Sequence, residues 1–237
     1  MRGVALLPWI PLAAFAAAAP HQPVDMTMTW KVSVDAAGAI TSLTPAEDRN
    51  KGLYQRLEPA VRKWHFTPAK VKGKAAPAET TLTVHITLEP IDSFYNVRVH
   101  DASTGARYAQ TSAPTLSEAV MTAHLGGAVL LEVAYDAQGR ITKAAAISGG
   151  DPKPSPDIER DAVLGVKQWT FAPETVAGHA VAGKALVPIC FAVGQPSQNA
   201  CHWNSPGTKT KQLLEAGRPL TLGSIVHLET DVTAHVL

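Results

Sequence analysis

The sequence predicts an α+β protein of two tandem small modules, each a three-stranded antiparallel sheet with a packed helix. Two pairs of matching segments predict the repeat. KVSVDAAGAIT from Lys31 matches EVAYDAQGRIT from Glu132 at six of eleven positions, and WHFTPAKVKGKAAPA from Trp64 matches WTFAPETVAGHAVAG from Trp169 at six of fifteen. Both copies keep the order strand, turn, strand, helix, strand, which favours helices packed on one face of an antiparallel sheet.

Alternation of apolar and polar residues predicts the strands of each copy. In the first strand the alternating apolar residues are Met26, Met28, Trp30, Val32 and Val34 in one copy and Val129, Leu131, Val133 and Tyr135 in the other. The second strand is expected to begin near Ile40 and Ile141. Apolar residues alternate again over residues 82–88 and 187–193, where the last strand of each copy is expected.

Hairpin turns are expected at Asp35–Gly38 and Asp136–Gly139, because aspartate bonds the turn backbone and glycine accepts a positive φ. A helix follows in each copy, since apolar residues recur at helical spacing. These residues are Leu53, Leu57, Val61 and Trp64, and Ile158, Ala162, Val166 and Trp169. Ser155 before Pro156 has the pattern of an N-cap. Pro59 is expected to kink or shorten the first helix.

The chain divides into five expected segments. These are a signal peptide or N-terminal apolar segment (1–19), a degenerate first module (24–90), a linker (91–111), a second module (112–194) and a tail with strand-forming residues (195–237). Arg2, the apolar run after it and the alanines that follow are typical of an exported protein cleaved after Ala18. The alternative is an uncleaved membrane anchor, although Pro8 and Pro11 interrupt the run.

Composition and motifs favour a binding protein over an enzyme. The formal net charge is +1 without a Lys/Arg cluster, so no nucleic-acid partner is expected. The nine histidines lack the spacing of a metal site, and neither a nucleophile elbow nor a phosphate loop is present. We expect no catalytic residue, metal or cofactor. His85 is expected to be a surface or partly buried histidine, and Trp64 and Trp169 are expected to anchor the core.

The second copy resembles the TonB C-terminal domain. The residues that carry the resemblance are Pro114, GAVLLEVAYDAQGRIT from Gly127 onward, the Trp169-x-Phe171-x-Pro173 block, Gly178 and VPICFAV. The first copy matches only the turn, Trp64-x-Phe66-x-Pro68 and Gly73. The resemblance implies a periplasmic protein of the cell envelope that takes part in transmembrane transport and binds a protein or peptide partner, such as a segment of an outer-membrane transporter, by strand addition.

The alternative that the resemblance implies is a membrane-anchored energy transducer of the TonB type. The N-terminal segment has no histidine, and no long Pro-rich spacer separates it from Val24. These departures from the family's transducers favour binding over force transmission. Membrane association is expected only if the N-terminal segment is uncleaved.

The last strand of the second copy is the expected partner-binding edge, because the family's last strand accepts the peptide. Its expected binding residues are Leu186, Val187, Ile189, Phe191 and Val193. Pro188 fits an edge strand but leaves a gap in the hydrogen-bond ladder. The alternative is that the segment after Cys201 covers this edge internally.

We predict a disulfide between Cys190 and Cys201, because an exported chain with two cysteines favours one. Thiol labelling of the unreduced, denatured protein should give no signal, and labelling after reduction should give two thiols per chain. Stoichiometric labelling before reduction would rule the disulfide out.

Overall fold

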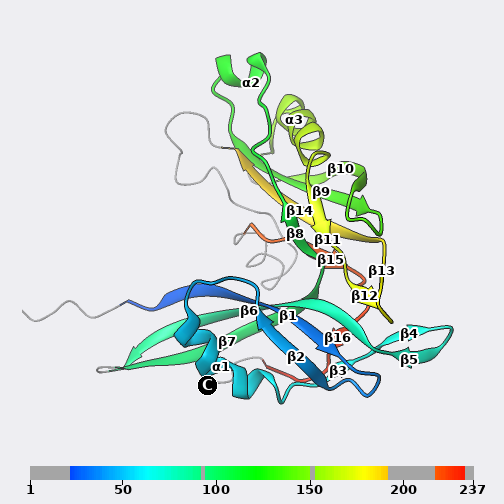
Figure 1. Cartoon of the computed structure of the whole chain (residues 1–237). Coiled ribbons are helices and arrows are strands. Elements are labelled where there is room, and N and C mark those ends of the chain that lie inside the picture. Colours follow the sequence, from blue (N-terminus) through cyan, green and yellow to red (C-terminus); the bar gives the residue numbers. More distant parts are fainter. Residues whose placement is uncertain (1–21, 92–93, 150–152, 192–216, 233–237) are drawn as a thin grey trace, which may run out of the picture.

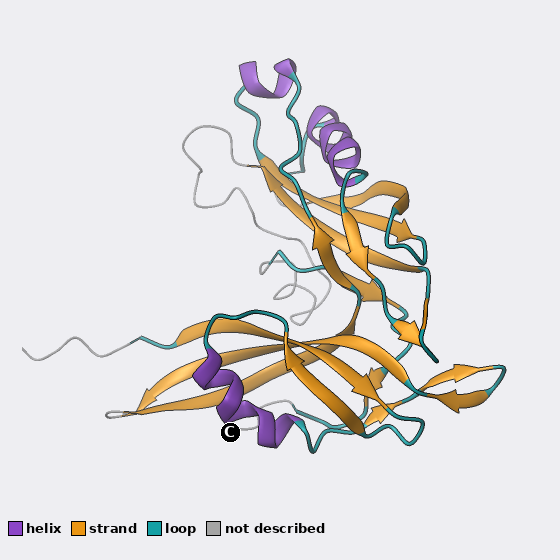
Figure 2. Ribbon diagram, viewed as in Figure 1, coloured by secondary structure: helices purple, strands orange, loops and turns teal. Residues whose placement is uncertain are grey.

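The computed structural model describes residues 22–91, 94–149, 153–191 and 217–232 (Figure 1). Of these residues 53% lie in strands and 15% in three helices, and the larger sheet curls into a half-barrel (Figure 2). The predicted fold class, α+β with two modules that each hold a three-stranded sheet and a packed helix, is therefore wrong. The protein is mainly β because segments predicted as linker and tail also form strands.

The larger sheet has six strands, and its central strand is β6. Its strands are β1 (Val24–Val34), β2 (Ile40–Pro45), β6 (Ala78–Ile91), β7 (Phe94–Gly105), β12 (Thr175–Val176) and β13 (His179–Ala180). The order is β13-β12-β6-β1-β2, and β7 also pairs with β6. All pairings are antiparallel. The strands β12 and β13 come from the second copy, so the two copies share one sheet.

The smaller sheet has four strands in the order β10-β9-β14-β15. Its strands are β9 (Gly127–Tyr135), β10 (Ile141–Gly149), β14 (Gly183–Phe191) and β15 (Leu220–Leu222). Three further pairs are β3 (Phe66–Thr67) with β16 (His227–Leu228), β4 (Ala69–Val71) with β5 (Lys74–Ala76), and β8 (Arg107–Gln110) with β11 (Thr170–Ala172). The C-terminal strands β15 and β16 thus pair with different parts of the molecule and not with each other.

The three described helices are α1 (Lys51–Val61), α2 (Glu118–Thr122) and α3 (Pro156–Val166). The predicted cap of α3 is confirmed, since Ser155 Oγ accepts a hydrogen bond from the Ile158 N–H at 3.3 Å. Pro59 does not shorten α1, which has eleven residues as α3 has. Proline has no N–H, so α1 lacks one backbone hydrogen bond at this position and still continues to Val61.

The predicted hairpin turns are confirmed and have equivalent geometry. Asp35 Oδ1 accepts from the N–H groups two and four residues later at 2.8 and 3.0 Å, and Asp136 Oδ1 does the same at 3.0 and 2.9 Å. Gly38 and Gly139 have φ of +87° and +77°. A Cβ at either glycine would lie within 2.0 Å of a carbonyl oxygen of the strand after the helix. Only glycine fits this close approach.

Each sheet buries its own apolar cluster. The first contains Trp30, Leu57 and Phe66, and the second contains Leu131, Ile158 and Phe171. Trp64 and Trp169 are 6% and 8% exposed, which confirms them as core residues. The alternating pattern therefore identified the buried face of each sheet, although it did not identify the number of strands.

A buried carboxylate joins the two halves. Glu174, just before β12, is 3% exposed and accepts hydrogen bonds from Thr80 Oγ1 on β6 at 2.6 Å and from Ser224 Oγ at 2.7 Å. Its second oxygen accepts from the Ile225 N–H at 3.2 Å. Both oxygens are thus satisfied, and the C-terminal segment is fixed against the larger sheet.

We predict that Gly139→Ala lowers the free energy of unfolding by about 2–4 kcal/mol. The left-handed backbone costs a Cβ about 1–2 kcal/mol, and the overlap with the Phe171 carbonyl adds the rest. Gly178→Ala is the matched control, because Gly178 has φ +79° but nothing within 4 Å of the position that a Cβ would take. Urea unfolding of both variants measures the difference. Equal losses in the two variants would contradict the close approach.

Candidate functional site

The predicted partner-binding strand β14 is partly covered. It pairs with β9 along its whole length, and β15 pairs with residues Lys184–Leu186 on its other side. Val187, Ile189 and Phe191 point into the second apolar cluster and are at most 6% exposed. Within the described ranges, residues 187–191 have no strand on their outer side. Leu186 is half-buried in a small cluster on the opposite face of the sheet.

Two of the residues predicted for this region lie outside the described residues, namely Val193 and Cys201. Cys190 lies on β14 with an exposed side chain. The disulfide therefore stays a prediction, and so does partner binding along β14.

A second strand edge is open on β1. This strand pairs with β6 through all eleven of its residues, but it pairs with β2 only from Trp30 onward. We call residues Val24–Thr29 the β1 edge. No described strand lies along its outer side.

The hydrogen bonds of Thr29 show which backbone groups face outward. The Thr29 N–H donates to Tyr54 Oη at 3.2 Å, and the Thr29 carbonyl accepts from the Ala46 N–H at 2.8 Å, both on the side away from β6. Every second residue of an antiparallel strand presents its N–H and C=O to the same side. The register with β6 is unbroken over this stretch, so Thr27 and Asp25 also present theirs outward.

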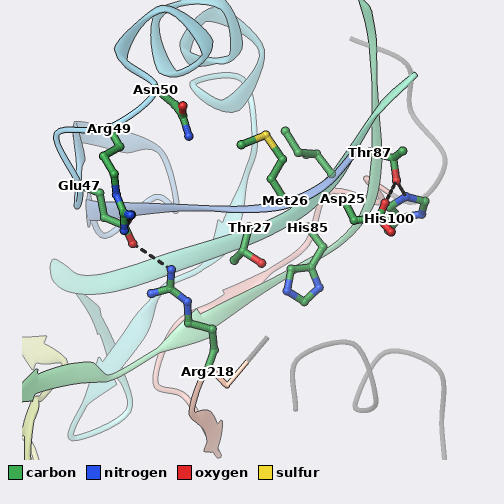
Figure 3. A pocket seen from close by; sticks show the side chains of 11 residues that line it. Asp25, Met26, Thr27, Glu47, Arg49, Asn50, His85, Thr87, His100 and Arg218 are labelled. Carbon is green, nitrogen blue, oxygen red and sulfur yellow. Dashed lines mark hydrogen bonds and ion pairs between the residues drawn. The ribbon is translucent and has the colours of Figure 1, made fainter. Parts of the chain in front are cut away.

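A cavity of about 760 Å³ adjoins the β1 edge (Figure 3). Most of its lining is polar, and its residues come from β1, β6, β7, the segment before α1 and the C-terminal segment. They are Asp25, Met26, Thr27, Glu47, Arg49, Asn50, His85, Ile86, Thr87, His100 and Arg218. The outward N–H and C=O groups of Asp25 and Thr27 thus lie beside a space large enough for several side chains.

Two arginines share one carboxylate at one end of the cavity. Arg218 donates to Glu47 at 2.9 Å, and Arg49 donates to the other oxygen of Glu47 at 3.4 Å. The hydrogen bond from Arg218 holds the pKa of the Glu47 carboxyl below its usual value, and the charges of both arginines act in the same direction. The local formal charge is therefore positive.

His85 lies beneath the cavity in a buried pair with Asp101. The two side chains are 7% and 4% exposed, and His85 Nδ1 lies 3.2 Å from Asp101 Oδ2. His85 Nε2 is buried and has no hydrogen-bond partner among the described residues. A buried polar atom without a partner costs about 1–3 kcal/mol, so this atom is a candidate for contact with a bound ligand.

The opposite end of the cavity holds a hydrogen-bonded trio. Thr87 Oγ1 donates to Asp25 Oδ1 and also contacts His100 Nε2. These three side chains come from β6, β1 and β7, where a bulge opposite His85 and Ile86 leaves His100 as the inserted residue of β7. Asp25 therefore has a hydrogen-bond partner of its own, whereas the two arginines share the single carboxylate of Glu47.

Most of this site does not follow from the sequence pattern. His85 is predicted at the surface or partly buried, but it is 7% exposed and pairs with Asp101 of the neighbouring strand β7. Its partner Asp101 and the nearby His100 lie in the predicted linker, and Arg218 lies in the predicted tail. The signal that could have found the polar face is the run Thr83, His85 and Thr87, which alternates with the apolar residues of β6.

The cavity offers a buried ring nitrogen as a hydrogen-bond donor or acceptor and two guanidinium groups as donors. Nothing in the described part of the chain connects His85 Nε2 to a hydroxyl that it could activate. In the same residues, no group of three His, Cys, Asp or Glu side chains could hold a metal ion. No helix of the described ranges is long and apolar enough to span a membrane.

No family model matches the chain, and no curated protein matches it. The geometry of the site is therefore the basis for a functional assignment.

We predict that Glu47→Gln lowers the free energy of unfolding by up to about 1 kcal/mol near pH 6, the usual value for a partly exposed ion pair. The folded pKa of Glu47 is lowered, so its contribution is complete above the unfolded pKa and is lost as the pH falls through the folded pKa. Urea unfolding at a series of pH values from 6 downward should show a difference between the wild type and the variant that shrinks as the pH falls below the unfolded pKa of Glu47. A difference that is independent of pH would contradict this assignment.

Proposed function

We propose that this protein binds an extended peptide segment, which adds as a strand to the β1 edge. The observation that carries the proposal is the outward direction of the Asp25 and Thr27 backbone groups beside the cavity. An unpaired row of N–H and C=O groups is a template for another strand. In this mode of recognition the main chain supplies affinity and the side chains supply selectivity.

The backbone of the β1 edge is held in an extended conformation by its pairing with β6. All eleven residues of β1 are paired with β6, and Met28 and Trp30 fix the inner end of the edge in the core at 1% exposure each. A strand that is already held on one side loses little conformational freedom when a second strand adds. The cavity provides room for side chains of the added segment.

The resemblance to the TonB C-terminal domain supports the same mode of binding at a different edge. In that family the last strand accepts the peptide. Here the corresponding outer edge of β6 is occupied by β7 and β12, and that of β14 is covered over three residues by β15. Pro188 also lacks the N–H that a partner on β14 would need. The β1 edge has none of these obstacles among the described residues.

A periplasmic location with a peptide partner, such as an outer-membrane transporter segment, fits this proposal and rests on the resemblance alone. The alternative of a membrane-anchored transducer depends on residues 1–21, which lie outside the described residues.

The test is a selection of peptides from a random heptapeptide library on the immobilised full chain. Thr27→Pro removes the outward N–H, and Thr27→Val keeps that N–H while it removes the hydroxyl. Peptides retained by the wild type should bind Thr27→Val with similar affinity and Thr27→Pro about tenfold or more weakly, since a lost hydrogen bond and the proline ring both oppose pairing.

Circular dichroism and thermal unfolding of both variants check that each one folds. Hydrogen exchange of the Asp25 and Thr27 amides should be fast in the free wild-type protein and slow with a selected peptide. Selected peptides that bind Thr27→Pro as well as the wild type would show that the β1 edge is not the binding site.

A further inference from the structure

The two faces of the sheet next to the β1 edge differ in chemistry. Side chains of a strand point alternately to opposite faces. In Figure 3, Met26 points toward Asn50 at the start of α1, whereas Thr27 and His85 point to the other side of the strands. An added strand must follow the same alternation, so its side chains would meet two different surfaces.

The face with Met26 carries an apolar groove of about 380 Å³. Its lining residues are Met26, Asn50, Gly52, Leu53, Arg56, Leu88, Tyr95 and Val97. Beside the groove, Val24 pairs with Leu88 on the same face and leaves 49% of its surface exposed. Apolar side chains of a partner would be removed from water here, at about 25 cal/mol per Å² of buried area.

The face with Thr27 carries the polar part of the cavity, whose lining also includes Met26 and Ile86 from the other face. His85 Nε2 is buried without a hydrogen-bond partner among the described residues. Arg49 and Arg218 share the single carboxylate of Glu47. Asp25 already accepts a hydrogen bond from Thr87. The excess charge at the Glu47 end is therefore positive, and an acidic side chain complements it.

The apolar groove and the cavity meet at the β1 edge, since Met26 and Asn50 line both. A single extended segment on this edge would contact both surfaces at once. The segment must therefore alternate apolar residues, which face the groove, with polar residues, which face the cavity.

We infer that the bound segment alternates apolar and polar residues, with its apolar side chains in the groove beside Met26 and an acidic side chain in the cavity near Arg49 and Arg218. This inference rests on the proposed strand addition at the β1 edge. It adds a sequence rule for the partner, in which apolar residues stand two apart and an acidic residue lies between two of them.

The rule can be tested with three synthetic heptapeptides carrying a fluorescent label, with anisotropy as the readout. The first is Thr-Leu-Thr-Leu-Glu-Leu-Thr, and the second has the same composition in the order Leu-Leu-Leu-Thr-Glu-Thr-Thr. The third replaces the glutamate of the first with lysine. The alternating glutamate peptide should bind the full chain about tenfold more tightly than each of the others, a difference of about 1.4 kcal/mol.

Variants of the protein test separately the apolar part of the rule, at the groove, and the charge part, at the cavity. Met26→Ser should weaken the alternating glutamate peptide about tenfold, and Leu53→Ser, on the helix side of the groove, should act in the same direction. Ile147→Ser is the matched control, because Ile147 is a 51% exposed apolar residue on β10 in the other sheet. It should leave binding unchanged.

The charge half of the rule depends on Arg49, whose side chain is 85% exposed, so Arg49→Gln should not affect folding. This variant should reduce the preference for glutamate over lysine severalfold. An unchanged preference would contradict the placement of the acidic side chain.

The outcomes separate this inference from the proposed function. If the alternating and block peptides bind equally, or if neither binds while library-selected peptides bind in a Thr27-dependent manner, the alternation rule is wrong and strand addition stands. If no peptide shows dependence on the Thr27 N–H, the proposed function itself is wrong.

Discussion

The buried carboxylate of Glu174 holds together the larger sheet, the segment before β12 and the C-terminal segment. A buried carboxylate is costly unless hydrogen bonds satisfy it, and here Thr80, Ser224 and Ile225 supply them from two other parts of the chain. These contacts hold β12 against the end of β6 and fix the C-terminal segment on the larger sheet. The same segment carries Arg218 to Glu47 at the cavity. The shape of the candidate site thus depends on a contact outside it.

The β1 edge is open because the chain leaves the sheet after β2. That strand ends at Pro45, the Ala46 N–H still bonds Thr29, and the backbone then turns through Asn50 in a left-handed conformation into α1. Tyr54 of α1 packs edge-on against Trp30 with ring centroids 4.9 Å apart, and its hydroxyl bonds the Thr29 backbone. Helix α1 therefore ends the pairing at Thr29 and leaves the groups of Thr27 and Asp25 uncovered.

Local patterns predicted the elements that local physics determines. The turns at Asp35 and Asp136, the cap at Ser155 and the buried tryptophans follow from short-range geometry and from alternation. The fold class failed because strand pairing is long-range. The polar residues of β7 gave a weak strand signal, although that strand pairs with β6 over most of its length. The candidate site was missed for the same reason, since His85 and Asp101 become partners only through this pairing.

The two copies differ in how far the outer edge of their last long strand is filled. The outer edge of β6 in the first copy is filled by β7, which extends the sheet and brings His100 and Asp101 beside His85. In the second copy, β15 fills only three positions of β14. The pairing that closes one edge of the first copy therefore also builds the polar wall of the cavity next to its other edge.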